Sequence, residues 1–332
     1  MAQFPSTRMR RNRQHKWLRD LVAETHLSTS DLILPLFVIE GENKREPIAT
    51  MPDIERLSID LLKEQVYLAR DLGIKAIALF PAIDNNLKNE TADEAYNPEN
   101  LLCRTVRELK RDFFDIGLIC DIALDPYTSH GHDGILKNND VANDETLEVL
   151  AKQAIVLAQA GCDIVAPSDM MDGRIGFIRK ELDNHNLSQV GILAYAAKYA
   201  SKFYGPFRDA VGSTNNFGKA NKFSYQMDFR NSSEALREVS LDIQEGADII
   251  LVKPANLYLD VIRQIKDRFS SPIFAYQVSG EYAAIYSASN CGWLDKNEGF
   301  YESLVAIKRA GANAIITYSA LSMAKWLKET IQ

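Results

Sequence analysis

Residues 68–82 read LARDLGIKAIALFPA, and three later stretches repeat the same pattern. These stretches are LAQAGCDIVAPSD (157–169), IQEGADIILVKPA (243–255) and IKRAGANAIITYSA (307–320). Each contains a helix end, a glycine, a short apolar run and a polar or proline break. Glycine just past a helix accepts the left-handed backbone of a C-cap, and an apolar run without alternation is typical of a parallel strand buried on both faces. Each stretch therefore predicts a helix followed by a buried parallel strand.

Further apolar runs supply the remaining strands, at 32–39, 116–124, 191–197 and 272–278. Patterns of helical length lie between the strands, at 57–72, 143–160, 232–245, 256–268 and 298–310. About eight β-α units in one chain predict an α/β fold, a (β/α)₈ TIM barrel that spans 31–332 as a single catalytic domain. An open doubly wound sheet is the alternative. Against it, no GxGxxG follows the first strand and no Walker A motif occurs.

Composition narrows the class of protein. The net charge of −7 argues against a nucleic-acid partner, and no apolar run is long enough to span a membrane. The four cysteines are scattered without a CxxC motif, which favours a reducing cytoplasm. Residues 1–19 contain five arginines, one lysine and no acid. Such a segment is typical of a transit peptide or of an arm that contacts another subunit, and we expect an arm over 1–30.

Two lysines follow buried strands at the predicted mouth of the barrel, where the active sites of this fold lie. Lys253 ends the run IILVK and Lys198 ends the run ILAYAAK. Burial lowers the pKa of a lysine, and a second ammonium nearby lowers it further. A neutral amine attacks carbonyl groups and forms a Schiff base. The pair therefore predicts an enzyme that acts on carbonyl substrates.

Other polar groups stand at the same strand ends. The stretch DIALDPYTSHGHDG (121–134) contributes Asp121, Asp125 and Asp133, which are candidates for proton transfer. Ser168 ends the next strand. A long glycine- and asparagine-rich segment, 203–231, predicts a lid. An arginine in such a lid suits bidentate binding of a carboxylate.

The motifs LPLFVIEG, DIALDPYTSHGHDG, VAPSDMMDGR, AKYASKFYGPFRDA, SYQMD, ILVKPA and YQVSGEYA together resemble the porphobilinogen synthase family, also called delta-aminolevulinic acid dehydratase. The resemblance runs from about residue 5 to 330. It implies condensation of two 5-aminolevulinate molecules to porphobilinogen with loss of two waters, in tetrapyrrole (heme) biosynthesis. It also implies a homo-octamer in which N-terminal arms embrace neighbouring barrels.

The resemblance assigns roles residue by residue. Lys253 matches the lysine that captures the first substrate, and Lys198 matches the lysine of the second site. The matching substrate-binding residues are Ser279 and Tyr318 for the first carboxylate, Arg208 and Lys222 for the second, and also Ser168, Phe207 and Gln226. The family often has arginine at the position of Lys222, so the lysine keeps the charge and loses the bidentate fork.

The metal pattern departs from that of zinc-dependent members, which carry three cysteines in the loop after the third strand. Ala123, Asp125 and Asp133 stand at those positions, so we expect no zinc in the active site. Carboxylates suit hard cations such as Mg²⁺. The resemblance to the aspartate-type, magnesium-responsive branch implies an allosteric Mg²⁺ at a subunit interface, near Glu238.

Two rival hypotheses remain on the residues alone. One is a class I aldolase-type enzyme that uses a single lysine on the same barrel. The other is a non-catalytic barrel that binds small carboxylates or serves as a scaffold for assembly. Schiff-base formation at neither, one or both of the two lysines distinguishes them.

Overall fold

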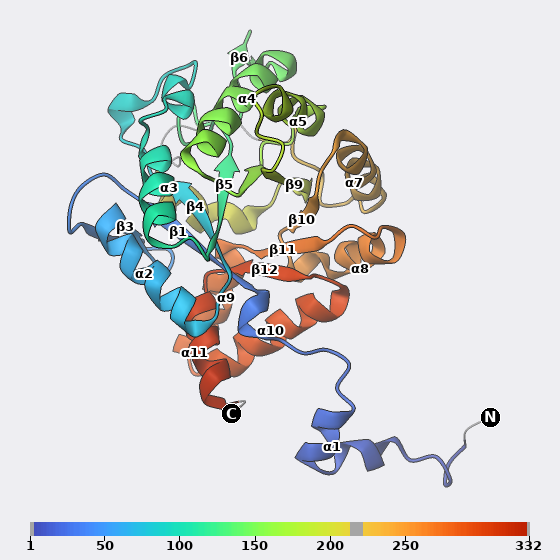
Figure 1. Ribbon diagram of the computed structural model, residues 1–332. Coiled ribbons are helices and arrows are strands. Elements are labelled where there is room, and N and C mark those ends of the chain that lie inside the picture. Colours follow the sequence, from blue (N-terminus) through green and yellow to red (C-terminus); the bar gives the residue numbers. More distant parts are fainter. Residues whose placement is uncertain (1–2, 213–221, 331–332) are drawn as a thin grey trace.

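The computed structural model describes residues 3–212 and 222–330. In these residues eight parallel strands close into a barrel, each paired with the next and the last with the first (Figure 1). The strands are β1 (Leu32–Val38), β4 (Ala76–Pro81), β5 (Gly117–Ile122), β8 (Ile164–Pro167), β9 (Gly191–Lys198), β10 (Ile249–Lys253), β11 (Ile273–Gln277) and β12 (Ala314–Thr317). Every predicted strand is present. The closed sheet rules out the doubly wound alternative.

A helix follows each barrel strand and covers its outer face (Figure 1). These helices are α2 (Ile59–Leu72), α3 (Leu101–Asp112), α4 (Asn143–Ala160), α5 (Arg174–Asn184), α7 (Ser233–Glu245), α8 (Leu259–Arg268), α10 (Lys296–Ala310) and α11 (Ala320–Thr330). The helices expected from sequence agree with α2, α4, α7, α8 and α10 to within a few residues. The strands are almost wholly buried, which explains why their sequences are continuous apolar runs.

The glycines of the repeated pattern end helices as predicted. Gly73, Gly161, Gly246 and Gly311 follow α2, α4, α7 and α10 with φ angles of 92°, 109°, 107° and 130°. At Gly161 the backbone N–H donates to the carbonyl oxygens of Leu157 and Ala158, which closes the helix and turns the chain toward β8. A side chain at such a φ angle is strained.

Several elements were not predicted from the sequence. Helices α6 (Gly205–Ala210) and α9 (Ser279–Asn290) follow β9 and β11, at the mouth of the barrel. A hairpin of β2 (Arg45–Pro47) and β3 (Glu55–Leu57) extends the sheet beside β1, and β6 (Leu136–Lys137) pairs with β7 (Asp140–Val141). These strands are too short to show a periodic pattern.

The N-terminal segment extends away from the barrel and contains α1 (Lys16–Leu21) (Figure 1). Leu27 is the first buried residue of the described chain. Large apolar side chains of this segment are exposed: Phe4, Met9, Trp17, Leu21 and Val22. Among the described residues, no helix is both long and apolar enough to cross a membrane.

The glycine cap after α4 leads to a prediction. We expect Gly161→Ala to lower the free energy of unfolding by about 1–2 kcal/mol, because alanine disfavours the left-handed backbone. Thermal unfolding followed by circular dichroism measures the change. The matched control is Gly176→Ala in α5, where the backbone is helical and the added methyl group meets Glu245 at ordinary contact distance; this change is expected to be neutral or stabilising. Equal stability of the two variants would contradict the role of Gly161.

Candidate active site

The barrel brings the two lysines side by side. Lys198 is the last residue of β9 and Lys253 the last of β10, and the register of the two strands pairs them directly. Each is 5% exposed. Because the carboxyl ends of parallel strands meet at one end of a barrel, both amines lie at the mouth.

Aromatic rings surround the amine of Lys253. Its Nζ atom lies 4.6 Å from the ring centroid of Tyr276, 5.0 Å from Phe207, 5.2 Å from Tyr204 and 5.3 Å from Tyr195. Burial, reinforced by the charge of Lys198, lowers the pKa of Lys253 to about 7. A large fraction of this lysine is therefore a neutral amine near pH 7, which is the form that attacks a carbonyl.

The tyrosines of this cage were not assigned to the site from the sequence. Tyr195 and Tyr276 lie within β9 and β11, and Tyr204 lies in the turn Lys202–Tyr204 before α6. An aromatic residue in a buried strand ordinarily packs in the core, so no signal in the sequence separated these rings from other core residues.

Lys198 and Asp121 lie in the same buried site as Lys253. Lys198 donates a hydrogen bond from Nζ to the carbonyl oxygen of Ser168. Asp121 is 9% exposed, and burial raises its pKa to about 6 against the opposing charges of Lys198 and Lys253. Its Oδ1 atom has no hydrogen-bond partner among the described residues. This carboxylate can take up or release a proton near neutral pH.

Asp125 and Asp133 share a different cation. The Nζ atom of Lys222 lies 3.1 Å from Oδ2 of Asp125 and 2.8 Å from Oδ2 of Asp133. Burial disfavours the charge on Lys222, but the two carboxylates outweigh it and raise its pKa. Burial likewise acts against the charge on Asp133, yet Lys222 lowers its pKa to about 2. The sequence had placed Lys222 on a substrate carboxylate and did not show this ion pair.

The residues matched to the first carboxylate lie close to the aromatic cage. The hydroxyl of Ser279 accepts a hydrogen bond from the backbone N–H of Phe207 at 2.9 Å, and Tyr318 shares a hydrogen bond of 2.8 Å with Tyr276 through their hydroxyl groups. The ring of Phe207 packs 5.4 Å from that of Phe80. Ser279, Phe207 and Tyr318 are therefore within one continuous site around Lys253.

The lid segment is described except for 213–221, which lie outside the described residues. Arg208 is half-buried on α6, directly after Phe207. The backbone of α6 is held by Arg56, whose guanidinium donates 2.5 Å hydrogen bonds to the carbonyl oxygens of Asp209 and Ala210. Gln226 is 4% exposed, and its Oε1 atom has no hydrogen-bond partner in the described part of the chain.

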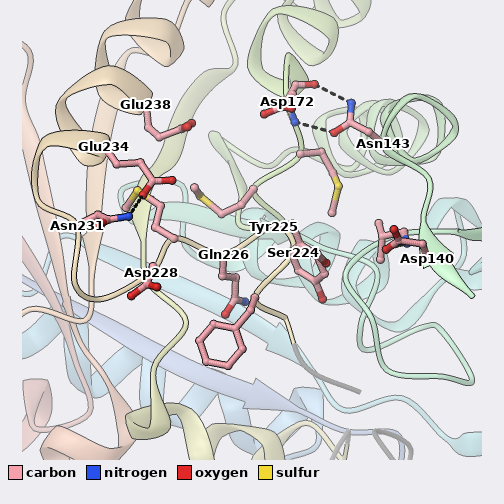
Figure 2. Close-up of a pocket in the computed structure, with 15 residues that line it drawn as sticks. Asp140, Asn143, Asp172, Ser224, Tyr225, Gln226, Asp228, Asn231, Glu234 and Glu238 are labelled. Atoms are coloured by element: carbon pink, nitrogen blue, oxygen red, sulfur yellow. Dashed lines mark hydrogen bonds between the residues drawn. The ribbon is translucent and has the colours of Figure 1, made fainter. Parts of the chain in front are cut away.

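Glu238 lies in a separate cavity of about 400 Å³ whose lining residues include neither lysine of the pair. Figure 2 shows Glu238 on α7 pointing toward Asp172, which is held by two hydrogen bonds to Asn143. Glu234 on the same helix accepts a hydrogen bond from the side chain of Asn231. Burial raises the pKa of Glu238, as do the charges of Asp242 and Asp172. Such an anionic cavity favours a bound cation.

Within the described residues, no group of three or more histidine, cysteine, aspartate or glutamate side chains is arranged as a metal site. The acidic cavity and the lysine site are nevertheless connected through the chain. Residues 223–228 line the acidic cavity (Figure 2), while Lys222, the residue before them, lies between Asp125 and Asp133.

Comparison with known proteins identifies the family. The family model described as delta-aminolevulinic acid dehydratase matches residues 6–326. The chain is 56% identical to the delta-aminolevulinic acid dehydratase of Bradyrhizobium diazoefficiens, over 97% of this chain and 91% of the relative. It is 53% identical to that of Chlamydia pneumoniae, over 95% and 94%.

A solved structure agrees with both the family and the barrel. The delta-aminolevulinic acid dehydratase (porphobilinogen synthase) of Toxoplasma gondii ME49, in complex with the reaction product porphobilinogen, superposes with a TM-score of 0.95 at 48% identity. The match covers 97% of this chain and 92% of that chain. It confirms the (β/α)₈ fold predicted from the sequence. Family model, relatives and structure together show that the chain belongs to the delta-aminolevulinic acid dehydratase family.

Proposed function

We propose that the chain condenses two molecules of 5-aminolevulinate to porphobilinogen with loss of two waters, as a porphobilinogen synthase (EC 4.2.1.24) of tetrapyrrole biosynthesis. The observation that carries the proposal is the pair Lys198 and Lys253, buried side by side at the barrel mouth. The Toxoplasma gondii relative with bound porphobilinogen supports it.

Each lysine supplies one Schiff base. The neutral amine of Lys253 attacks the ketone of one substrate, and expulsion of water leaves an imine; Lys198 does the same with the other substrate. Porphobilinogen contains one new carbon–carbon bond and one new carbon–nitrogen bond between the two substrates. Each bond forms by addition at an imine carbon, which leaves that carbon bonded to the lysine nitrogen. Loss of a proton from the adjacent carbon or nitrogen then expels the lysine as the free amine. Two waters have left by this point, one for each imine, and both lysines are regenerated.

Asp121 is the proposed proton carrier. Its pKa of about 6 lets it accept a proton near neutral pH, as removal of a proton next to an imine requires. Its free Oδ1 atom and the influence of Lys198 and Lys253 on its charge support this role. Asp125 and Asp133 are proposed to hold the free amino group of a substrate.

The remaining polar side chains of the site are proposed to bind the two substrate carboxylates. We assign Ser279 and Tyr318 to the first, beside Lys253, and Arg208, Lys222 and Gln226 to the second. Lys222 occupies the space between Asp125 and Asp133. A substrate ammonium that binds to these aspartates would compete with Lys222 and free it for the substrate carboxylate. Ser168 and Phe207 complete the walls around the amines.

The active-site loop does not suit zinc. The zinc site of zinc-dependent members needs cysteine thiolates at the three matching loop positions. Ala123 offers no ligand atom, and the carboxylates of Asp125 and Asp133 are paired with Lys222. We therefore assign the chain to the aspartate-type branch, with no zinc among the reacting groups.

An allosteric Mg²⁺ fits the acidic cavity better. The carboxylates of Glu238, Glu234, Asp172, Asp140 and Asp228 line it (Figure 2), and oxygen ligands suit this hard cation. A Mg²⁺ held by some of these carboxylates would offset part of their negative charge. Because Phe223–Asp228 line the same cavity, it would also steady the chain directly after Lys222. We propose that a neighbouring subunit completes the site.

The N-terminal arm is proposed to build the homo-octamer. Trp17 and Leu21 of α1 are 61% and 75% exposed, and an apolar surface of this kind is typical of an interface with another chain. The arm (1–30) precedes the single catalytic domain (31–332). A cytoplasmic location accords with the cysteines, which are all free among the described residues.

The Schiff bases provide the first test of the function. With 5-aminolevulinate and cyanoborohydride, we expect peptide mass spectrometry to find reduced adducts on both Lys253 and Lys198. Lys253→Met and Lys198→Met are each expected to lower porphobilinogen formation about a thousandfold or more. If Lys198→Met retains most of the activity, the one-lysine aldolase is correct. If neither lysine is modified, both the porphobilinogen synthase and the one-lysine aldolase hypotheses are wrong.

The pH dependence of trapping tests the low pKa of Lys253. The protonated amine does not react, so adduct formation at Lys253 should fall about tenfold per pH unit below a midpoint near the pKa of about 7. Lys198 lowers this pKa and Asp121 raises it. The midpoint should therefore move to higher pH in Lys198→Met and to lower pH in Asp121→Asn. An unchanged midpoint in both variants would contradict the electrostatic account.

Removal of metal ions tests whether the acidic cavity binds Mg²⁺ and whether activity depends on zinc. We expect a zinc-selective chelator to leave activity intact and removal of Mg²⁺ to lower it. Glu238→Ala should weaken the response to Mg²⁺ while leaving the trapping of Lys253 unchanged. Glu302→Ala on the exposed face of α10 is the control. Activity that disappears with the zinc chelator and returns with Zn²⁺ would overturn the assignment.

Sedimentation tests the role of the arm. Trp17→Asp is expected to shift the protein to smaller assemblies, because a charge cannot be buried in an apolar contact at little cost. Phe114→Asp is the control, since Phe114 is also exposed, at 87%, but belongs to the barrel. Unchanged assembly in Trp17→Asp would remove the arm from the interface.

A further inference from the structure

Glu281 is a buried carboxylate close to the proposed nucleophile that the mechanism above does not use. It lies in the first turn of α9 and is 3% exposed. Among the described residues, no side-chain cation forms an ion pair with it. A charge in this position is costly unless several donors compensate it.

The compensating donors come from two strand ends. Oε2 of Glu281 accepts hydrogen bonds from the backbone N–H groups of Val278 at 2.8 Å and Ala255 at 3.3 Å. Oε1 accepts one from the N–H of Asn256 at 2.7 Å. Val278 directly follows β11, whereas Ala255 and Asn256 follow Lys253 by two and three residues. The carboxylate therefore ties the end of β10 to the end of β11.

A helix cap explains only part of this arrangement. A glutamate at the third position of a helix commonly accepts from the N-cap N–H, which accounts for the bond from Val278. The bonds from Ala255 and Asn256 reach a segment more than twenty residues earlier in the chain, and a cap does not need them. Burial raises the pKa of Glu281 to about 7, against the backbone hydrogen bonds that lower it. Burial therefore disfavours the charged carboxylate.

The segment that Glu281 holds is fixed on its other side as well. The carbonyl oxygen of Lys253 accepts hydrogen bonds from the N–H of Tyr199 at 3.0 Å and from the hydroxyl of Tyr204 at 3.1 Å. The side chain of Asn256 is bonded to Ser303 on α10, at 2.8 Å from its Nδ2 atom. Hydrogen bonds thus fix the backbone both at Lys253 itself and at Ala255 and Asn256, which follow it.

The same carboxylate positions Ser279. The helix that begins at Ser279 packs so closely on the turn before α6 that a methyl group on Gly280 would lie 2.6 Å from the carbonyl oxygen of Phe203. This contact brings the N–H of Phe207 onto the Ser279 hydroxyl. Movement of α9 would therefore displace Ser279 and the root of the lid together.

We propose that Glu281 is a positioning residue, which sets the amine of Lys253 and the hydroxyl of Ser279 in register by bridging the ends of β10 and β11. The proposal rests on the proposed function, in which Lys253 forms a Schiff base. In this role Glu281 acts through the backbone groups that it binds. Its effect should therefore be local to Lys253 and should spare Lys198, whose amine is held instead by the carbonyl group of Ser168.

The test compares adduct formation at the two lysines in Glu281→Gln. Glutamine keeps the size but turns an N–H₂ group toward backbone N–H donors. With levulinate, the 4-oxo acid that lacks the amino group, and cyanoborohydride at a pH above the pKa of Lys253, we expect trapping at Lys253 to slow about tenfold or more. Trapping at Lys198 should be unchanged. Glu302→Gln on the exposed face of α10 is the matched control.

The outcomes separate the two proposals. No trapping at Lys253 in the unaltered protein overturns the proposed function, and this inference with it. Normal trapping there, together with rates in Glu281→Gln that are unchanged at both lysines relative to the unaltered protein, overturns only the role of Glu281. Equal slowing at both lysines shows a merely structural role and also overturns it.

Two further variants keep the test decisive if Glu281→Gln does not fold. Glu281→Asp retains the charge on a shorter side chain, and Ser303→Ala removes the contact to Asn256 without altering the carboxylate. Each should slow trapping at Lys253 more than at Lys198, by less than the glutamine variant. A preserved ratio of the two rates in both variants overturns the proposal.

Discussion

A small buried site holds two neighbouring ammonium groups only at a high cost in free energy. Lys198 and Lys253 end adjacent strands at the same level of the barrel, where protein atoms have replaced most of the water around them. Burial and mutual repulsion are both relieved when one amine loses its proton, and the pKa of Lys253 falls to about 7. The neutral amine that the proposed mechanism requires thus arises from burial and from the neighbouring Lys198.

The barrel maintains this constraint because its parts resist relaxation. Parallel strands buried on both faces cannot shift register without exposing apolar side chains. The rings around Lys253 exclude water that would solvate its charge. Glu281 adds backbone contacts at the point where β10 ends. A looser site would admit water or let the lysines separate, and the pKa of Lys253 would rise toward its ordinary value.

Asp125, Asp133 and Lys222 are charged groups of the site, and Lys222 forms ion pairs with both aspartates. Asp121 is the carboxylate whose charge acts most strongly on Lys253. The acidic cavity around Glu238 lies apart from both lysines, yet it shares the segment 223–228 with the lid. The segment 223–228 directly follows Lys222, and this gives the cavity and the lysine site a short physical connection.

The sequence by itself determined the order of elements and the candidate residues. Glycines after helices and continuous apolar runs are local features, so the repeated pattern predicted four of the barrel strands and the further apolar runs predicted the other four. The position of Lys198 and Lys253 after such runs predicted their place at the mouth. Tertiary structure alone decided which groups meet. The ion pair of Lys222 joins segments about a hundred residues apart. The rings of the aromatic cage come from separate elements of the barrel. Glu281 accepts hydrogen bonds from backbone groups that follow another strand. Such contacts depend on register and barrel closure, which bring together residues whose local patterns are those of ordinary core or loop positions.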